Sequence, residues 1–141
     1  MIDKKSKYDI AVVGATGAVG RRMLATLEER NFPVGRLSAL ASARSVRQRL
    51  PFRGGVAEVK ELRENSFMGI DIALFSAGSS ISKNYAPIAV ESGCVVIDNS
   101  SAWRMEKEIP LIIPEVNSSA LLKNVGLSQI LTVQPYRWLL R

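Results

Sequence analysis

The segment that most constrains the fold is a glycine-rich turn between two apolar elements. Gly14, Gly17 and Gly20 follow an apolar run over residues 8–13 and open a segment with helical periodicity over residues 18–30. In such a turn the first glycine permits the tight bend, the second lets the backbone approach a phosphate, and the third allows close helix–strand packing. The amino end of the helix adds free N–H groups and partial positive charge. The segment therefore predicts a site for a dinucleotide pyrophosphate, with a plain tight turn as the alternative.

The rest of the chain alternates between short apolar runs and helical patterns. Strands are predicted over residues 8–13, 37–42, 56–59, 70–75, 94–97 and 111–113, and helices over 18–30, 81–92 and 118–123. Residues 44–55 are polar and basic and predict a loop or hairpin. Continuous apolar strands separated by helices indicate an α/β fold of the Rossmann type, a doubly wound, mostly parallel sheet with helices on both faces. Polar loops follow several of these strands, at the carboxyl edge where open sheets bind ligands.

The segment after the second predicted strand bears on the choice between NAD and NADP. NAD sites usually place an acidic residue about 20 residues beyond the glycine turn, where it binds the ribose hydroxyls. No acidic residue occurs between Glu29 and Glu58, and the strand instead ends at Ser42-Ala43-Arg44-Ser45. A serine and an arginine suit a 2′-phosphate, which a carboxylate would repel. This pattern favours NADP as the cofactor; a solvated basic loop is the alternative.

Composition limits the other classes of function. The 141 residues fit one domain, and the net charge of +6 comes from scattered basic residues without interleaved aromatics, so no nucleic-acid partner is expected. No apolar stretch approaches the ~20 residues of a membrane helix, and the basic start is not a secretory signal, so a cytoplasmic protein without a membrane partner is expected. The chain has no histidine and a single cysteine, Cys94, so no metal site is predicted. Cys94 opens an apolar strand and is expected to be an inert buried thiol.

From Asp9 to Asn117 the sequence resembles aspartate-semialdehyde dehydrogenase, over most of that family's N-terminal domain. The matching stretches are A-V-V-G-A-T-G-A-V-G (11–20), L-E-E-R-N-F-P-V (27–34), L-A-S-A-R-S (40–45), D-I-A-L-F-S-A-G (71–78), V-V-I-D-N-S-S-A-W-R-M (95–105) and P-E-V-N (114–117). The glycine turn is shared with related N-acetyl-glutamyl-phosphate reductases. The D-N-S-S-A-W-R and P-E-V-N stretches are much more specific to the semialdehyde enzymes.

The resemblance implies a reaction, a small-molecule substrate and a set of site residues. Such oxidoreductases of amino-acid biosynthesis reductively dephosphorylate aspartyl-4-phosphate with NADPH, through a thioester on a cysteine. The implied cofactor residues, together with those indicated by the turn and by the second strand, are Gly14, Thr16, Gly17, Ala18, Val19, Gly20, Ser42, Arg44, Ser45, Ser76, Ala77 and Gly78. Arg104 would hold the phosphate of the substrate, a role that suits an arginine just past a strand end.

Residues 126–141 match nothing in the family. The family's nucleophile lies in an N-P-N-C-S-T stretch shortly after P-E-V-N, and no such stretch is present. Within the synonymous freedom of the genetic code, however, the bases encoding residues 126–141 can be read from the third position of the first codon as L-I-A-N-P-N-C-S-T-I-Q-M-V-V-A. The hypothesis is therefore a frameshift near residues 123–126, which places the lost cysteine codon across Thr132 and Val133.

The predicted organisation is an NADP-binding domain over residues 1–125 and an out-of-frame tail over residues 126–141. The family's histidine base, its substrate-carboxylate arginine and its dimer-forming region would all lie beyond the shift, so no catalytic residue is assigned. Without a thiolate no thioester can form, and this chain is expected to be inactive alone. The alternatives are a non-catalytic nucleotide-binding module and a non-functional gene remnant.

Overall fold

The computed structural model describes residues 4–123 and 126–130. Strands, helices and short 3-10 turns alternate along the chain. The strands are β1 (Tyr8–Val13), β2 (Val34–Ala41), β3 (Arg49–Phe52), β4 (Gly55–Glu61), β5 (Ile72–Phe75), β6 (Val95–Asp98), β7 (Leu111–Ile112) and β8 (Leu127–Ile130). The helices are α1 (Ala18–Glu29), α2 (Ser79–Glu91) and α3 (Pro114–Asn117), and the 3-10 turns are η1 (Ala43–Ser45), η2 (Glu64–Phe67) and η3 (Ser118–Lys123).

The strands form one sheet in the order β3-β4-β2-β1-β5-β6-β8-β7. Every neighbouring pair is parallel except the β3–β4 hairpin. The chain first moves outward from β1 through β2 to the hairpin, and then crosses to the other side of β1 with β5. In open α/β sheets the crevice at such a reversal, outside the carboxyl ends of the strands, is where ligands bind.

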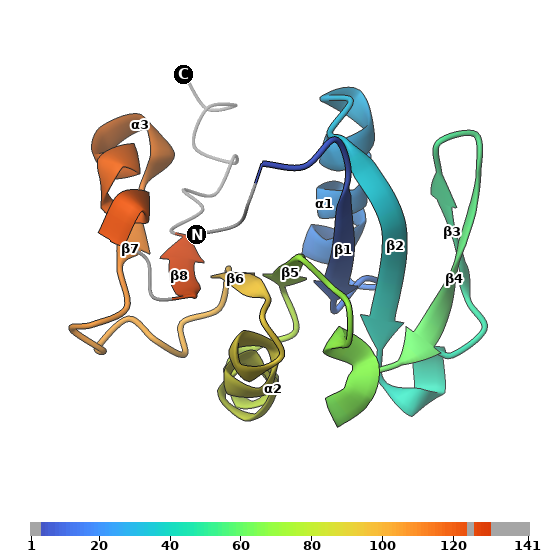
Figure 1. The fold of residues 1–141 in the computed structure, drawn as a ribbon. Helices are drawn as coiled ribbons and strands as arrows, with labels where there is room; N and C mark the ends of the chain where they lie inside the picture. Colours follow the sequence, from blue (N-terminus) through green and yellow to red (C-terminus); the bar gives the residue numbers. More distant parts are fainter. Residues whose placement is uncertain (1–3, 124–125, 131–141) are drawn as a thin grey trace, which may run out of the picture.

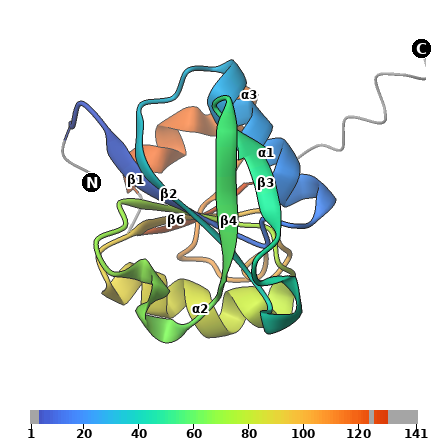
Figure 2. The same cartoon turned by 90° about the vertical axis from the view of Figure 1, so that its right-hand side faces the viewer.

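Helices cover both faces of the sheet, which confirms the predicted fold class. On one face Leu24 of α1 packs with Ile10 and Val12 of β1. On the other face Ala86 and Ala89 of α2 pack with the intervening residues of β1. Figure 1 shows α2 below the sheet and α1 behind β1, and in Figure 2 α1 and α3 lie on the side opposite to α2. Strand β1 is therefore buried from both sides, as its uninterrupted apolar sequence predicts.

Most differences from the expected elements are shifts of one to three residues at an end. The 44–55 segment contains η1 and β3, so its hairpin reading is confirmed. The predicted helix over residues 118–123 is a 3-10 turn, and the α-helical turn, with Pro114 in its first turn, comes just before it. Proline suits that position because its missing N–H has no acceptor there in any helix.

Strand β8 lies inside the sheet although its residues follow the predicted boundary at 125. It pairs in parallel with both β6 and β7. Leu127 and Ser128 are buried, and the Oγ of Ser128 has no hydrogen-bond partner among the described residues. The positions assigned to the lost cysteine codon, Thr132 and Val133, lie outside the described residues.

Candidate functional site

The turn after β1 is held between β2 and the loop that follows β5. The N–H groups of Gly14 and Ala15 both donate to the carbonyl of Leu40, at 2.9 and 3.1 Å. Gly14 has a φ of +83°, and a Cβ at this position would lie 2.8 Å from the carbonyl oxygen of Ser76. Only glycine combines that conformation with so close an approach. The turn therefore rests directly on the carboxyl ends of the central strands.

Gly20 is required by contacts within the turn itself. A Cβ on Gly20 would lie 2.1 Å from the carbonyl oxygen of Gly14 and 2.7 Å from the Cα of Ala15. Both neighbours are backbone atoms and cannot move aside as a flexible side chain can. The absence of a side chain at Gly20 lets α1 start immediately beside β1, which aims the amino end of the helix across the edge of the sheet.

Gly17 differs from the other two glycines because the protein itself leaves room for a side chain there. A Cβ on Gly17 would meet only the carbonyl oxygen of Gly14, at an ordinary 3.5 Å. Gly17 is the N-cap of α1, is exposed, and has a φ of −73° that any residue adopts. The free side of its backbone is therefore a cradle that a methyl group would fill, as the approach of a phosphate to the backbone requires.

The first turn of α1 offers an electrostatic environment suited to an anion. It carries no acidic residue and no side-chain cap, so its N–H groups are not neutralised by a side chain. Ala18 and Val19 are exposed, and Thr16 is half-buried. Arg21 donates from Nε to the carbonyl of Thr16 at 3.0 Å, which holds a positive charge beside the turn. These features fit the pyrophosphate of a dinucleotide.

The turn after β2 places Ser42, Arg44 and Ser45 at the same edge. The N–H of Ser45 donates to the carbonyl of Ser42 at 2.9 Å, which closes η1. Ser42 and Arg44 are exposed and Ser45 is half-buried. The guanidinium of Arg44 makes no ion pair or hydrogen bond within the described part of the chain. A free guanidinium in a turn without carboxylates is suited to a phosphate.

The loop after β5 contributes Ser76, Ala77 and Gly78. The Oγ of Ser76 donates to the carbonyl of Val13 at 3.2 Å, and its N–H donates to the same carbonyl at 2.9 Å. Gly78 is the N-cap of α2 with a φ of +89°, a conformation that favours glycine. The amino ends of α1 and α2 therefore both lie at the carboxyl edge, next to the reversal in strand order.

The turn after β6 carries Arg104 at this edge. Asp98, which is fully buried, accepts hydrogen bonds from the N–H of Ser100 at 2.7 Å and from its Oγ at 2.9 Å. The Oγ of Ser101 lies 2.9 Å from that of Ser79 and so connects this turn to the start of α2. Arg104 is exposed. Sequence reasoning did not single out Asp98, Ser79 or Ser101, although the D-N-S-S run is a turn-forming pattern that points to the aspartate.

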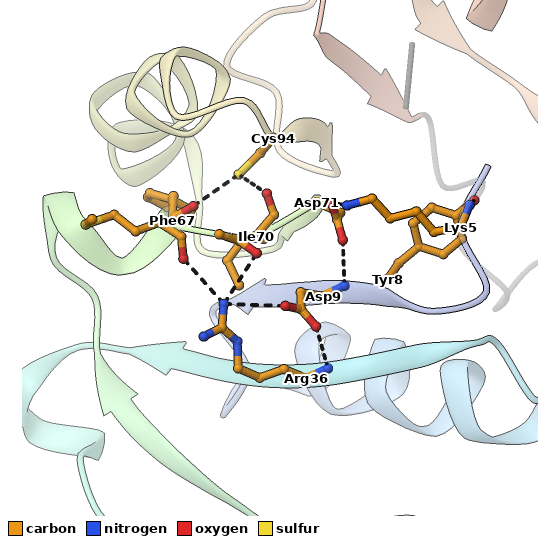
Figure 3. A network of polar contacts seen from close by, with 10 residues as sticks. Lys5, Tyr8, Asp9, Arg36, Phe67, Ile70, Asp71 and Cys94 are labelled. Carbon is orange, nitrogen blue, oxygen red and sulfur yellow. Dashed lines mark hydrogen bonds and ion pairs between the residues drawn. The ribbon is translucent and has the colours of Figure 1, made fainter. Parts of the chain in front are cut away.

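Cys94 lies at the opposite edge of the sheet. It directly precedes β6, whereas the site residues follow the carboxyl ends of the strands. Its Sγ donates to the carbonyls of Ile70 at 3.3 Å and Phe67 at 3.7 Å (Figure 3). Burial raises the pKa of this thiol to about 11. The thiol is therefore protonated at neutral pH and does not reach the carboxyl edge.

A charged network also lies at the amino edge. Lys5 Nζ contacts Asp71 Oδ1 at 2.5 Å, and Asp71 Oδ2 accepts from the N–H of Asp9 at 2.9 Å. Asp9 in turn accepts from the N–H of Arg36 at 2.7 Å (Figure 3). The network joins the starts of β1, β2 and β5. Its contacts are satisfied within the protein, so we assign it to stability rather than to ligand binding.

Replacing Asp71 by asparagine is expected to lower the free energy of unfolding at neutral pH by about 1 kcal/mol, a value reduced for solvent screening of the pair. The hydrogen bond from Lys5, followed by that from Asp9, holds the pKa of Asp71 below its ordinary value. A lowered carboxyl pKa stabilises the fold above the unfolded-state pKa, and this contribution is lost as pH falls through the folded-state pKa. Denaturant unfolding across an acid pH series should show parent and variant converging at low pH. The exposed pair Arg22–Glu29 supplies the control, since Glu29→Gln should change little.

The described residues contain neither a candidate metal-binding cluster nor a helix that could cross a membrane. Across residues 4–123 and 126–130, no group of three or more histidine, cysteine or acidic side chains could hold a metal ion. None of the helices in this part of the chain has the length and apolar character needed to cross a bilayer.

Comparison with known proteins connects this geometry to one family. Residues 9–124 match the family model described as semialdehyde dehydrogenase, NAD binding domain. Aspartate-semialdehyde dehydrogenase of Aquifex aeolicus is 60% identical over 111 residues, which is 78% of this chain and 33% of that protein. The structure of aspartate semialdehyde dehydrogenase II from Vibrio cholerae, complexed with ASA, superposes with a TM-score of 0.85 at 44% identity, over 89% of this chain and 42% of that chain.

A more distant structure shows the same fold. Aspartate semialdehyde dehydrogenase with NADP from Candida albicans has a TM-score of 0.69 at 23% identity and covers 87% of this chain and 42% of that one. The chain spans about a third of the length of the curated relatives that it matches.

Proposed function

The chain belongs to the semialdehyde dehydrogenase family through its NAD-binding domain, and from this we propose that it is the NADP-binding, N-terminal part of an aspartate-semialdehyde dehydrogenase. The observation that carries the proposal is the open cradle at Gly17, set beside a turn that holds Arg44 without any carboxylate. The whole enzyme would carry out NADPH-dependent reductive dephosphorylation of aspartyl-4-phosphate in amino-acid biosynthesis. The relatives described above support this reaction, since they are aspartate-semialdehyde dehydrogenases.

The cofactor residues would divide by position along the edge. Backbone from Gly14 through Gly20, with Thr16, Ala18 and Val19 in the turn, would bind the pyrophosphate at the amino end of α1. Ser42, Arg44 and Ser45 would bind the 2′-phosphate, and the Ser76–Gly78 segment would lie beside the cofactor. When bound, NADPH supplies the hydride for the reduction. The protein's own part is to hold and orient it at the carboxyl edge.

Titration of the purified chain with NADPH and with NADH tests this proposal. We expect saturable binding of both by a cooperatively folding protein, with the tighter binding to NADPH. The 2′-phosphate adds a dianion that Arg44 can bind bidentately, and the turn that carries Arg44 has no carboxylate of its own to repel it. A folded chain that binds neither nucleotide would overturn the proposal.

Arg44→Ala is expected to weaken NADPH binding by about 10- to 100-fold, because a charge-assisted hydrogen-bonded pair is removed. NADH binding should change little, since NADH has no phosphate at that end. The ratio of the two dissociation constants is the measurement. Arg22→Ala is a matched control, because this arginine is already paired with Glu29 on the outer side of α1. Equal weakening for both nucleotides would contradict the assignment of Arg44.

We propose that Arg104 binds the phosphate of the substrate. It is an exposed arginine in the turn after β6, and the buried Asp98 and the Ser79–Ser101 contact position that turn against α2. This chain spans about a third of its relatives' length. The other groups of a substrate site would therefore lie in the part of the relatives that this chain does not match.

We also propose that residues 126–141 are read out of frame and that this chain is catalytically inactive. The alternative reading of the bases encoding residues 126–141 as L-I-A-N-P-N-C-S-T supports the shifted frame. The hydroxyl of Ser128, buried and without a partner among the described residues, does not distinguish the frames, because Ser82 in α2 has the same environment. Sequencing of the gene tests the frame directly; a sequence in which no N-P-N-C reading exists downstream of codon 123 would exclude the shift.

A non-catalytic NAD(P)-binding module is the second candidate. The observation that favours it is that the turn, both helix amino ends and the Arg44 loop are complete within the described residues, while the one cysteine lies at the other edge. Tight NADPH binding by a stable chain would support the module, and aggregation of the purified chain would favour a non-functional remnant. On composition we further propose a cytoplasmic location and no nucleic-acid partner.

A further inference from the structure

Two arginines adopt a backbone conformation that arginine rarely adopts. Arg47 has a φ of +70° and Arg53 a φ of +50°. A bulky residue in this left-handed region is an outlier that requires compensation from its surroundings. The two residues flank the short strand β3, so they form a natural pair for comparison.

The contacts of Arg53 account for its conformation. Its guanidinium donates to the carbonyl of Val34 at 3.1 Å and to that of Phe32, and it lies 5.3 Å from the centre of the Phe52 ring. Arg53 and Gly54 form the two central positions of the β3–β4 hairpin, and both have positive φ, as such tight hairpins require. The side chain of Arg53 is therefore committed to the fold.

The backbone of Arg47 is fixed, but its side chain is not used by the protein. The N–H of Arg47 donates to the carbonyl of Val59 at 3.0 Å, which holds the residue against β4. Its side chain is exposed, and within residues 4–123 and 126–130 its guanidinium makes no ion pair or hydrogen bond. Among the described residues no hydrogen bond or ion pair of the Arg47 side chain therefore compensates for its unfavourable backbone conformation.

Arg44 and Arg47 lie in two successive hydrogen-bonded turns that share Ser45. Ser45 N–H donates to the carbonyl of Ser42, and Gln48 N–H donates to the carbonyl of Ser45 at 3.2 Å. This segment packs on β4, whose Val59 is the register partner of Ala39 in β2. The next residue of β2, Leu40, holds the glycine turn through its carbonyl. Arg47 is therefore attached to the carboxyl-edge loop that follows β2, close in sequence to the proposed 2′-phosphate ligands.

The surrounding charges leave Arg47 without a counter-ion. The chain has no acidic residue from position 30 to position 57. Of the nearby carboxylates on β4, that of Glu61 is paired with Arg63 at 2.6 Å, and Glu58 stands opposite Arg49 in the hairpin register. Other arginines at the sheet are engaged, as Arg36 is with Asp9. Among the described residues Arg44 and Arg47 thus have two unpaired guanidiniums in successive turns of one loop, and such a loop is suited to a phosphate dianion.

We propose that Arg47 is a second arginine for the 2′-phosphate and a specificity-determining residue for NADPH over NADH. The inference rests on the proposed function, because it assigns a further residue to that cofactor site. The hydrogen bond to Val59 holds its backbone in the left-handed conformation, and this leaves an exposed guanidinium three residues after Arg44.

Arg47→Gly tests the inference with two readouts of opposite sign. NADPH should bind about tenfold more weakly, with NADH binding unchanged, because one charge-assisted contact to the phosphate is lost. The thermal midpoint should stay constant or rise, because glycine adopts a positive φ without steric cost. Arg47→Asn, which also tolerates this conformation, provides a second uncharged variant, and Arg47→Lys should retain part of the preference for NADPH.

Arg53→Gly is the matched control, since it makes the same substitution at another left-handed arginine beside β3. It should lower the thermal midpoint and leave the ratio of NADPH to NADH affinity unchanged. An unchanged ratio in both Arg47→Gly and Arg47→Asn would overturn the inference. If the parent binds NADPH saturably and only Arg44→Ala changes the ratio, the inference fails while the proposed function stands; a folded parent that binds neither nucleotide refutes both.

Discussion

Gly20→Ala is expected to unfold the domain, whereas Gly17→Ala is expected to leave the fold intact and remove dinucleotide binding. At Gly20 the added Cβ would lie 2.1 Å from the carbonyl oxygen of Gly14, and every close neighbour is backbone. Relief requires α1 to move away from β1, which opens the cluster around Leu24 and Val12. Such overpacking against backbone should cost at least about 3 kcal/mol, a large part of the stability of a domain this size.

At Gly17 the same methyl group finds ordinary space within the protein. Its nearest neighbour would be the carbonyl oxygen of Gly14 at 3.5 Å, and the φ of −73° is open to alanine. Loss of a glycine N-cap should change the free energy of unfolding by about 1 kcal/mol or less. The methyl group would, however, occupy the side on which a phosphate must approach, so NADPH affinity should fall by about 100-fold or more.

Thermal unfolding and NADPH titration of the two variants separate these effects. The expected pattern is a low midpoint for Gly20→Ala and a parent-like midpoint with weak binding for Gly17→Ala. A Gly17→Ala protein that binds NADPH as the parent does would show that this side of the turn does not face the cofactor. A Gly20→Ala protein with the same thermal midpoint as the parent would show that α1 can move away from β1 without loss of stability.

The fold could be predicted because its signals are local and repeated. Strand β1 has its expected limits, Tyr8–Val13, because an uninterrupted apolar run ending at a glycine permits little else. Helix α2 begins two residues before the expected Ile81, because Gly78 rather than an apolar residue sets its start. These elements are determined by residues close in sequence, and periodicity detects them.

Features that depend on distant partners could not be predicted. The burial of Asp98 follows from the position of β6 between β5 and β8, which no local pattern predicts, whereas its pairing with the nearby Ser100 fits the D-N-S-S pattern. The positive φ of Arg47 follows from the hydrogen bond of its N–H to the carbonyl of Val59 in β4, which no local sequence pattern predicts. The different roles of the three turn glycines also needed coordinates, because only the neighbours of an added Cβ distinguish Gly17 from Gly20.

Strand β8 is part of the sheet although the sequence pattern does not predict a strand there. Its residues match nothing in the family, so no strand is expected there from the sequence. Backbone hydrogen bonds to β6 and β7 form it nevertheless, because they do not depend on side-chain identity. Leu127 and Ser128 are both buried in the sheet, and among the described residues the Oγ of Ser128, like that of Ser82, has no hydrogen-bond partner.

We expect this chain to form no NADPH from aspartate semialdehyde and phosphate, however tightly it binds NADP. The family's reaction needs a thiolate at the carboxyl edge to carry the acyl group. The chain's single cysteine is at the amino edge, is buried, and has its pKa raised to about 11, so only about one thiol in 10⁴ is ionised at pH 7. No residue in the described part of the chain substitutes for it at the site.

The comparison protein is a variant in which the proposed frameshift between codons 123 and 126 is reversed. There the stretch N-P-N-C-S-T would follow β8, at the edge where Gly17 and Arg104 lie, and the rate should exceed that of the present chain by about 10⁶-fold, the usual cost of losing a nucleophile. Cys94→Ser should leave the corrected enzyme active, because Cys94 only donates to the carbonyls of Ile70 and Phe67. Phosphate-dependent turnover by the uncorrected chain that disappears in Cys94→Ser would instead make Cys94 the nucleophile. That result would require the amino edge of the sheet to open, because the thiol would have to lose its hydrogen bonds to the carbonyls of Ile70 and Phe67.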